Sequence, residues 1–234
     1  MTDPPSETPP PLPVPVPVLG TVGILGGTGD QGRGLAYRWA NAGLEVLIGS
    51  RERERADAAA IEIAHATGAD VRGGSNVDVA MQADIVVLAV PWEGHAALLH
   101  SIAAVVAGKV VVDCVNPIGF DERGAYALDV GEGSAAQQAA AILVDSWVVA
   151  AFHHVSAVLL NDHAVETIDC DIMVLGDDRG ATDVVQQLAA SIVGARGFYA
   201  GRLRNAHQVE ALTANLISVN RRYRAHAGFR LTGV

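Results

Sequence analysis

Residues 22–36 read VGILGGTGDQGRGLA, an apolar run followed by a glycine-rich turn. Gly27, Gly29 and Gly32 have the spacing G-x-G-x-x-G, directly after a predicted strand and at the start of a predicted helix. In a dinucleotide-binding unit such glycines allow a tight turn, close approach of the backbone to a diphosphate, and close packing of the helix on the strand. The spacing alone is a weak signal, because glycine-rich turns occur in many ordinary loops. Its place between a strand and a helix, whose first amides attract anions, predicts dinucleotide binding.

The pattern around this stretch predicts an α/β fold. Apolar, β-branched runs alternate with alanine-rich segments of helical period. Such alternation is typical of a Rossmann-like, doubly wound parallel sheet with helices on both faces. Strands are predicted near 21–26, 44–49, 84–90, 109–115 and 147–152, with a further extended piece near Val71, and helices near 30–42, 52–66, 93–106 and 134–144.

We expect three parts in the chain. Residues 1–20 contain eight of the ten prolines and form a predicted disordered arm, because proline supports neither a helix interior nor a sheet ladder. Residues 21–155 form the predicted dinucleotide-binding domain, and residues 156–234 a smaller C-terminal α/β domain. The elements expected in the smaller domain are a strand in CDIMVLG (170–176), a helix near 180–193, a short GFYAG segment (197–201) and a long terminal helix near 203–227.

Composition narrows the classes of function. The 234 residues include 26 acidic and 16 basic ones, for a net charge of -10, and nucleic-acid binding would need a basic face. Only 18% of the residues are charged, which favours a subunit interface. The two unpatterned cysteines, Cys114 and Cys170, indicate neither a disulfide framework nor a metal site. No apolar run reaches the roughly 18 residues of a membrane span. We therefore expect a cytoplasmic protein that binds no metal, nucleic acid or membrane.

A charged stretch, IGSRERERAD around Arg51, lies at the end of the second predicted strand. NAD-binding units place an acidic residue at the end of this strand, whereas an arginine there accommodates the 2′-phosphate of NADP. Arg51 and Arg55 are four residues apart, so they lie on one face if a helix begins at Ser50, and Arg53 points elsewhere. Ser50 and, from the opposite loop, Thr28 offer hydroxyl groups. A solvated helix start with exposed ion pairs is the plain alternative, but the position of the cluster favours NADP.

Mostly apolar residues gather where three further predicted strands end. In a parallel sheet the carboxyl ends of the strands border the ligand crevice. Lys109, the single lysine, opens a strand at the remote end, and no Tyr-x-x-x-Lys pair exists, so no catalytic acid or base is predicted. His153 and the adjacent His154 point to opposite sides if the chain is extended, so at most one faces the crevice. The predicted crevice residues are Val90, Pro91, Trp92, Asn116, Ile118, His153, Val155 and Ala157.

Several stretches together resemble the NADPH-dependent reductases of coenzyme F420, an 8-hydroxy-5-deazaflavin. They are GILGGTGDQGRGLA, GSRxxxRA, AVPWEGH, AFHHVSA, the GDD at 176–178 and the ending EALTANLISVNRRYRAHAGFRLTG. The resemblance runs from about Thr21 to the C-terminus. It implies a homodimeric NADP-dependent oxidoreductase that moves a hydride reversibly between NADP(H) and F420 without a strong acid or base from the protein. The C-terminal domain would contribute to the deazaflavin site and to the dimer.

The resemblance also divides the predicted site residues among the parts of the two cofactors. The 2′-phosphate would lie with Thr28, Ser50, Arg51 and Arg55, and the diphosphate with Gly29, Asp30 and Gln31. The nicotinamide half would be bordered by Trp92, Ile118 and Ala157, and the deazaflavin by His153 and Val155. Near the C-terminus, positive charges that help to hold the acidic tail of F420 are suggested at Arg221, Arg222, Arg224 and Arg230, with a solvated helix face as the alternative.

Two other functions fit the same dinucleotide-binding domain. An NADP-dependent reductase of a small carbonyl or imine would need a proton donor, for which His153 or His154 is the only good candidate. A non-catalytic module that senses NADP(H) would need an exposed partner surface, for which the proline-rich arm is the sole hint. Turnover with a deazaflavin separates the three functions.

Overall fold

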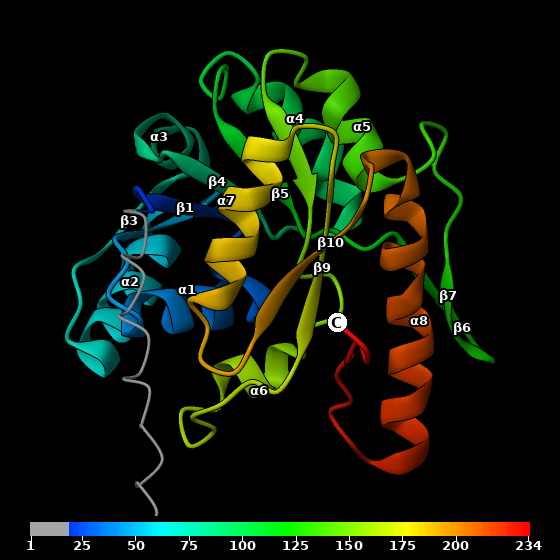
Figure 1. Cartoon of the computed structure of the whole chain (residues 1–234). Coiled ribbons are helices and arrows are strands. Elements are labelled where there is room, and N and C mark those ends of the chain that lie inside the picture. Colours follow the sequence, from blue (N-terminus) through cyan, green and yellow to red (C-terminus); the bar gives the residue numbers. More distant parts are fainter. Residues whose placement is uncertain (1–18) are drawn as a thin grey trace, which may run out of the picture.

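The computed structural model describes residues 19–234, so nearly all of the predicted proline-rich arm lies outside the described residues. A single eight-stranded sheet crosses the molecule (Figure 1). Its strands are β1 (Val22–Leu25), β2 (Val46–Ser50), β3 (Val71–Ser75), β4 (Ile85–Leu88), β5 (Val110–Asp113), β8 (Trp147–Ala150), β9 (Asp171–Gly176) and β10 (Arg196–Gly201). Two further strands, β6 (Ile118–Asp121) and β7 (Gly124–Ala127), form a separate antiparallel hairpin.

The strand order of the sheet is β10-β9-β8-β5-β4-β1-β2-β3. The six strands from β8 to β3 run parallel, β9 is antiparallel to β8, and β10 is parallel to β9. The part from β3 to β8 has the order of a dinucleotide-binding sheet. The predicted Rossmann-like α/β fold is confirmed. Because β9 and β10 continue this same sheet, the predicted domain boundary at residue 155 stays a prediction.

Helices cover both faces of the sheet (Figure 1). One face carries α1 (Asp30–Asn41), α2 (Arg53–Thr67), α6 (Ala157–Asn161) and α7 (Arg179–Ala190). The other face carries α3 (Asn76–Gln82), α4 (His95–Ile102), α5 (Ala135–Ile142) and the start of the long α8 (Ala206–Tyr223). Two short 3₁₀ helices, η1 (Trp92–Gly94) and η2 (Leu203–Asn205), precede α4 and α8.

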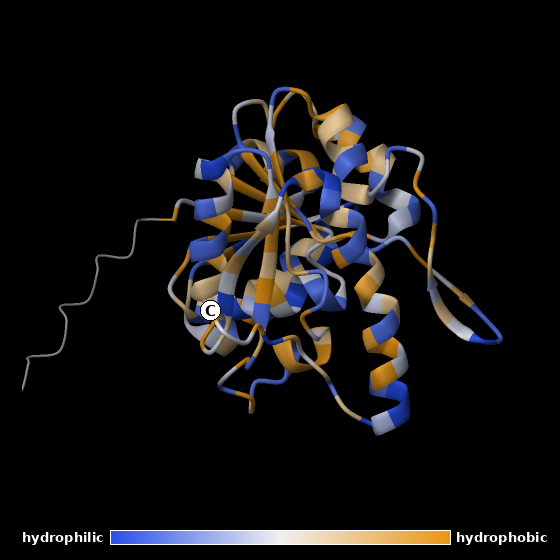
Figure 2. Ribbon diagram, turned by 45° about the vertical axis from the view of Figure 1, so that its right-hand side comes forward, coloured by the Kyte–Doolittle hydropathy of each residue, from blue (hydrophilic) through white to orange (hydrophobic). Residues whose placement is uncertain are grey.

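The alternation of side chains along each strand builds the two cores. In β4, Ile85 and Val87 pack in the layer of α1 and α2, whereas Val86 and Leu88 pack in the layer of α3 and α4. A strand with both faces covered has a continuous apolar sequence, and for this reason the sequence IVVL predicts a buried strand. Figure 2 shows the hydrophobic strands enclosed by helices with mixed outer faces.

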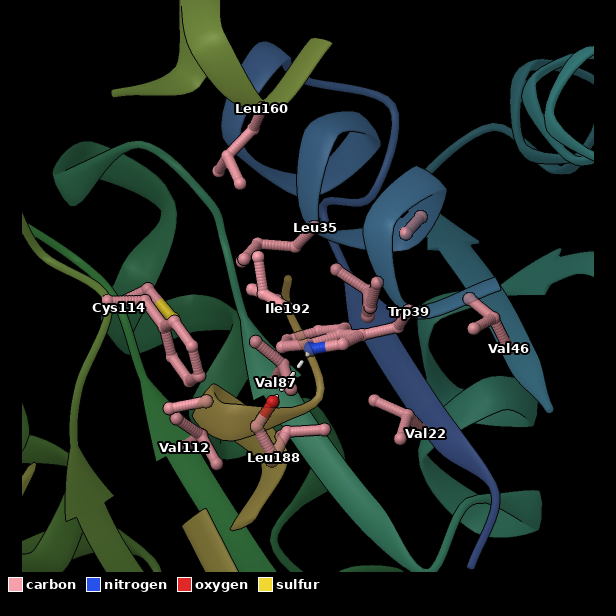
Figure 3. Packing of buried hydrophobic residues seen from close by; sticks show 14 of the residues in the cluster. Val22, Leu35, Trp39, Val46, Val87, Val112, Cys114, Leu160, Leu188 and Ile192 are labelled. Carbon is pink, nitrogen blue, oxygen red and sulfur yellow. Dashed lines mark hydrogen bonds between the residues drawn. The ribbon is translucent and has the colours of Figure 1, made fainter. Parts of the chain in front are cut away.

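Trp39 of α1 joins the two halves of the chain. Its side chain is fully buried, and its indole Nε1 donates a hydrogen bond of 3.1 Å to the carbonyl oxygen of Leu188 in α7 (Figure 3). A buried indole needs such an acceptor, so this contact sets the depth at which α7 packs beside α1. The helix after β9 is thereby fixed to the helix that opens the dinucleotide-binding half.

The structure differs from the prediction in several short elements. The hairpin and the helices α3 and α6 were not predicted, because four to seven residues leave too short a periodic pattern. The terminal helix ends at Tyr223 instead of residue 227, since Arg224 adopts a left-handed conformation with φ of 51°. Lys109 lies at the remote end of the sheet, where its Nζ donates to three carbonyl oxygens at the end of α3. Among residues 19–234 no helix is long and apolar enough to cross a membrane.

Candidate active site

A cavity of about 630 Å³ lies beyond the carboxyl ends of β1, β2 and β4. We call it the phosphate pocket. Seven of the predicted site residues line it, namely Thr28, Gly29, Ser50, Arg51, Arg55, Val90 and Pro91. Sequence reasoning missed the rest of its wall, which is formed by Gly26, Glu52, Asn76, Ala89, Glu93, Gly94, Ala97, Leu98 and Ser101. The glycine-rich turn and the arginine stretch, far apart in sequence, therefore face one hollow.

We call the glycine-rich turn between β1 and α1, residues 26–29, the phosphate loop. The loop and the start of α1 depend on glycine at two positions. Gly26 has φ of +76°, and a Cβ there would come within 2.6 Å of the Val90 side chain and 2.7 Å of the Ala89 carbonyl oxygen. A Cβ on Gly32 would lie 2.6 Å from the Cα of Gly27, so this glycine allows the start of α1 to pack on the loop. Gly29 meets no such obstacle among residues 19–234, and it precedes α1 without a side-chain cap. The first amides of α1 are thus left for an anion.

The arginines of the stretch around Arg51 differ in whether they pair with a carboxylate. Arg53 pairs with Asp57 at 3.7 Å and with Asp78 at 3.9 Å. Among residues 19–234 neither Arg51 nor Arg55 has an acidic partner within 4.0 Å, and both line the phosphate pocket. The helix begins at Arg53 and not at Ser50, so the reason given for their common face was wrong. The turn before α2, rather than helical spacing, brings the two side chains to the same cavity.

Asn76 connects the third strand to the phosphate loop. It is buried at the start of α3, and its Oδ1 accepts a hydrogen bond of 3.3 Å from the amide of Gly26. The same oxygen would lie 2.8 Å from a Cβ on Gly49, so β2 must carry a glycine opposite it. The signal available in the sequence was its place just after the weakly predicted strand near Val71.

The remaining predicted residues lie outside the wall of the phosphate pocket, around the ends of neighbouring strands. Gly27 lies in the loop, where its amide donates to Gly49, and Asp30 and Gln31 open α1. Trp92 lies in η1, Asn116 follows β5, and Ile118 opens β6. His153 and Val155 are buried after β8, and Ala157 opens α6. We call residues 152–155 the crevice segment. The Gln31 side chain ties it to α1 by donating a hydrogen bond of 3.0 Å to the Phe152 carbonyl oxygen.

Two polar groups beside this segment are buried without a hydrogen-bond partner. Within the described residues, neither the Oδ1 of Asn116 nor either ring nitrogen of His153 has one. They are neighbours, since the Asn116 Nδ2 donates to the His153 carbonyl oxygen at 2.9 Å. Burial lowers the pKa of His153 to about 4, so the ring is neutral at pH 7 and offers one donor and one acceptor. Buried groups left unpaired are costly, and this pair fits a ligand that has both a donor and acceptors.

A buried hydrogen-bonded pair that sequence reasoning missed lies behind these loops. His95, at the start of α4, has its Nε2 at 2.8 Å from the carboxylate of Asp113 and its Nδ1 at 3.0 Å from the Oε1 of Gln138. Burial acts to lower the pKa of His95, but the hydrogen bond to Asp113 raises it overall. Asp113 also accepts the Val115 amide at 2.9 Å. The pair therefore holds the segment after β4 in a fixed position relative to the segment after β5.

The expected cluster of arginines near the C-terminus is divided in the structure. Arg221 and Arg222 lie in the exposed last turn of α8, and Arg224 ends it. Arg230 is instead paired with Asp169 and Asp171. Its guanidinium is already engaged in holding the terminal segment.

Comparison with known proteins agrees with this geometry. Residues 21–117 match the family model described as NADP oxidoreductase coenzyme F420-dependent. An F420-dependent NADP reductase of Methanothermobacter thermautotrophicus is 42% identical over 91% of this chain and 95% of its own. The one from Methanocaldococcus jannaschii is 37% identical over 91% and 98%. The crystal structure of a putative F420-dependent NADP-reductase from Arthrobacter sp. FB24 has a TM-score of 0.77 and 26% identity, covering 90% of this chain and 98% of that one. The chain belongs to the family of F420-dependent NADP reductases.

Proposed function

We propose that the protein is an oxidoreductase that transfers a hydride reversibly between NADP(H) and coenzyme F420. The observation that carries the proposal is that Arg51 and Arg55 line a pocket beside the glycine-rich loop and have no acidic partner among residues 19–234. The relatives of this chain are F420-dependent NADP reductases. NADPH would supply the hydride and the deazaflavin ring would accept it. The protein then has to bind both cofactors, bring them together and exclude water.

The phosphate pocket would hold the NADP half. The first amides of α1, from Asp30 and Gln31, would hold the diphosphate at the favourable end of the helix dipole. Arg51 and Arg55 would bind the 2′-phosphate, because two guanidinium groups can form several charge-assisted hydrogen bonds to one phosphate. Thr28 and Ser50 line the same cavity and add hydroxyl groups.

The groups around the crevice segment would hold the reacting rings. Trp92, Ile118 and Ala157 would border the nicotinamide, and His153 and Val155 would face the deazaflavin. The unpaired Asn116 oxygen and His153 nitrogens support a ligand with a donor and acceptors along one edge, which the pyrimidine ring of a deazaflavin provides. We expect these groups to orient the ligand and not to exchange protons with it.

A reductase of a small carbonyl or imine is the weaker alternative. Such a reaction needs a proton donor, and only His153 and His154 were candidates. Burial lowers the pKa of each to about 4, so both rings are almost entirely unprotonated at neutral pH. A sensing module without turnover is also less favoured, since the relatives of this chain are named as reductases.

The test mixes the purified protein with NADPH and oxidised F420 and follows the loss of the visible absorbance of the deazaflavin. We expect rapid bleaching with NADPH and slow bleaching with the same concentration of NADH. Bleaching at equal rates would reject the assignment of the arginines to the 2′-phosphate. Tight NADPH binding without bleaching would reject F420 as the substrate.

We further propose that the protein is a cytoplasmic homodimer. The support is the hairpin, which packs along α8 and exposes 70% of Phe120 and 46% of Tyr126, while Tyr223 near the other end of α8 is 73% exposed. Large apolar side chains at one edge of a molecule are typical of interfaces. Sedimentation should give twice the mass of the chain, and Phe120→Glu should reduce it to a monomer. A wild-type monomer at micromolar concentration would refute the dimer.

A further inference from the structure

The crevice segment has an unusual backbone. Phe152 has φ of 63°, a conformation that residues with a Cβ rarely adopt. Its side chain is fully buried and meets Trp39 edge to face, with ring centroids 5.4 Å apart. A strained residue of this kind persists only where its surroundings determine its conformation, and such residues cluster at functional sites. The surroundings on the far side of the segment therefore matter for its function.

His154 is the residue through which the far side holds the segment. Its Nε2 accepts a hydrogen bond of 3.4 Å from the amide of Met173 in β9, and its Nδ1 lies 3.8 Å from the Sγ of Cys170. The ring of Phe229 approaches it with centroids 5.9 Å apart. His153 makes different contacts, because its carbonyl oxygen accepts from Asn116 at 2.9 Å and from Thr213 at 3.0 Å. The two rings therefore differ, because the ring of His154 has a hydrogen-bond partner, whereas neither ring nitrogen of His153 has one among residues 19–234.

Phe229 is held in place by the terminal segment of the chain. The buried carboxylate of Asp171 receives both nitrogens of the Arg196 fork at 2.7 Å, Arg230 at 2.8 Å and the amide of Leu231 at 2.6 Å. In return, the Asp171 amide donates to the Phe229 carbonyl oxygen at 2.7 Å. These contacts anchor residues 229–231 to the first residue of β9, although the segment has no regular secondary structure.

A continuous series of contacts therefore runs from the end of the chain to the crevice. It passes from Asp171 through Phe229 to His154, and along the backbone to His153. We propose that His154 and Phe229 are positioning residues, which hold the crevice segment so that the ring of His153 is presented to the deazaflavin. This inference rests on the proposed function and adds to it a role for the C-terminal residues.

The experiment compares Phe229→Ala and His154→Phe with the wild type in the full-length chain. We expect the KM for F420 to rise about tenfold in both variants, while the Kd for NADPH changes by less than about twofold. His154→Gln, which keeps an acceptor for the Met173 amide, should recover part of the loss. Tyr199→Ala removes an exposed aromatic side chain from β10 and is the matched control, with no expected effect.

A second measurement does not depend on turnover. Proton NMR titration, with the His153 signal assigned by its absence in His153→Gln, gives the pKa of that ring directly. If the contacts of His154 or Phe229 are lost, we expect water to reach the ring of His153. The pKa of that ring should then rise from about 4 toward the ordinary value of about 6.5. Folded variants with an unchanged KM and an unchanged His153 pKa would overturn the inference, as would an equal loss of NADPH affinity. If the wild type does not reduce F420, the proposed function fails, and the titration still decides the positioning role.

Discussion

The phosphate pocket and the crevice segment are two regions built in opposite ways. The phosphate pocket is open and charged, and its wall includes the exposed Arg51 and Arg55, to which we assign the preference for NADP. The crevice segment is buried, and the polar atoms without a hydrogen-bond partner among residues 19–234 are the ring nitrogens of His153 and, beside the segment, the Oδ1 of Asn116. In the proposed function, one region would recognise an anion through charge, whereas the other would recognise the shape and hydrogen-bonding pattern of a ring.

The difference teaches how one small protein can hold two different cofactors. Exposed charge attracts a phosphate at long range and tolerates imprecise placement, although salt screens it. A hydride transfer needs close and accurate placement of two rings, and a rigid, dry environment provides it. Precision therefore has to be supplied where the rings meet, and at the crevice segment, where we propose that they meet, the chain has a buried backbone with an unusual φ and contacts from distant parts of the sequence.

The largest effect is expected from the arginines. Replacing Arg51 and Arg55 together by Leu should weaken NADPH binding by about 3 kcal/mol, roughly a hundredfold, because each guanidinium makes hydrogen bonds to a charged group. Binding of NADH should change little. Arg53→Leu is the control, since Arg53 is paired with Asp57 and Asp78. Titration calorimetry with both dinucleotides checks the result, and an undiminished preference for NADPH in the double variant would contradict it.

The next effect concerns the loop common to both dinucleotides. Gly32→Ala places a Cβ 2.6 Å from the Cα of Gly27, so the start of α1 must shift. Overpacking of this kind costs about 2 kcal/mol, and we expect NADPH and NADH to lose similar affinity. Gly131→Ala is the control, because Gly131 is exposed and a Cβ there would have no atom of the described residues within 4 Å. A selective loss of NADPH alone would show that the loop, and not only the arginines, discriminates between the two.

An effect of comparable size is expected on the pH dependence of folding stability, through His153 in the crevice segment. Burial lowers the pKa of His153 to about 4 in the folded state, below the value of about 6.5 for a free imidazole. Its contribution to stability is therefore complete above pH 6.5 and is lost as the pH falls toward 4, by about 2 kcal/mol between pH 7 and pH 5. Urea denaturation should show that His153→Gln loses less stability than the wild type over this interval. Parallel pH curves for the two proteins would mean that His153 is hydrated in the native state.

Glu210 provides an opposite pH dependence elsewhere in the molecule. Burial raises its pKa to about 7. Two backbone amides at the start of α5 donate hydrogen bonds to the carboxylate and act in the opposite direction, but burial has the larger effect. A raised carboxyl pKa stabilises the folded state in acid, and that stabilisation is lost as the pH rises through about 7. Glu210→Gln should therefore lose more stability than the wild type between pH 7 and pH 5. An unchanged slope would indicate that the carboxyl is ionised throughout.

The smallest effect tests the crevice itself. His153→Phe removes the donor and the acceptor of the ring and keeps an aromatic group, so the KM for F420 should rise about tenfold, or about 1.4 kcal/mol. The Kd for NADPH should stay the same, because His153 does not line the phosphate pocket. His100→Phe, on the exposed side of α4, is the control. An unchanged KM for F420 would remove His153 from the site.

The part of the phosphate pocket that was predictable from the sequence, seven of its lining residues, consists of local features. Gly29, Thr28 and the arginines each lie within a few residues of a strand end, and parallel strands bring their carboxyl ends to one edge. Gly26 and Asn76 were missed, although both touch the loop. The φ of Gly26 depends on its approach to Val90, and the contact of Asn76 joins segments 50 residues apart. Neither relation leaves a periodic pattern.

The sequence by itself determined the alternating fold, the place of the dinucleotide loop and the arginines beside it, because these depend on periodicity and on spacing between neighbours. Only the tertiary structure decided which histidine ring has a hydrogen-bond partner among residues 19–234, how Asp113 pairs with His95, and that Phe229 in the terminal segment packs against His154. Those features depend on burial and on contacts between residues far apart in the chain. Hydrogen-bond partners and pKa values in a closed interior are properties of the packed molecule, and no local stretch carries them.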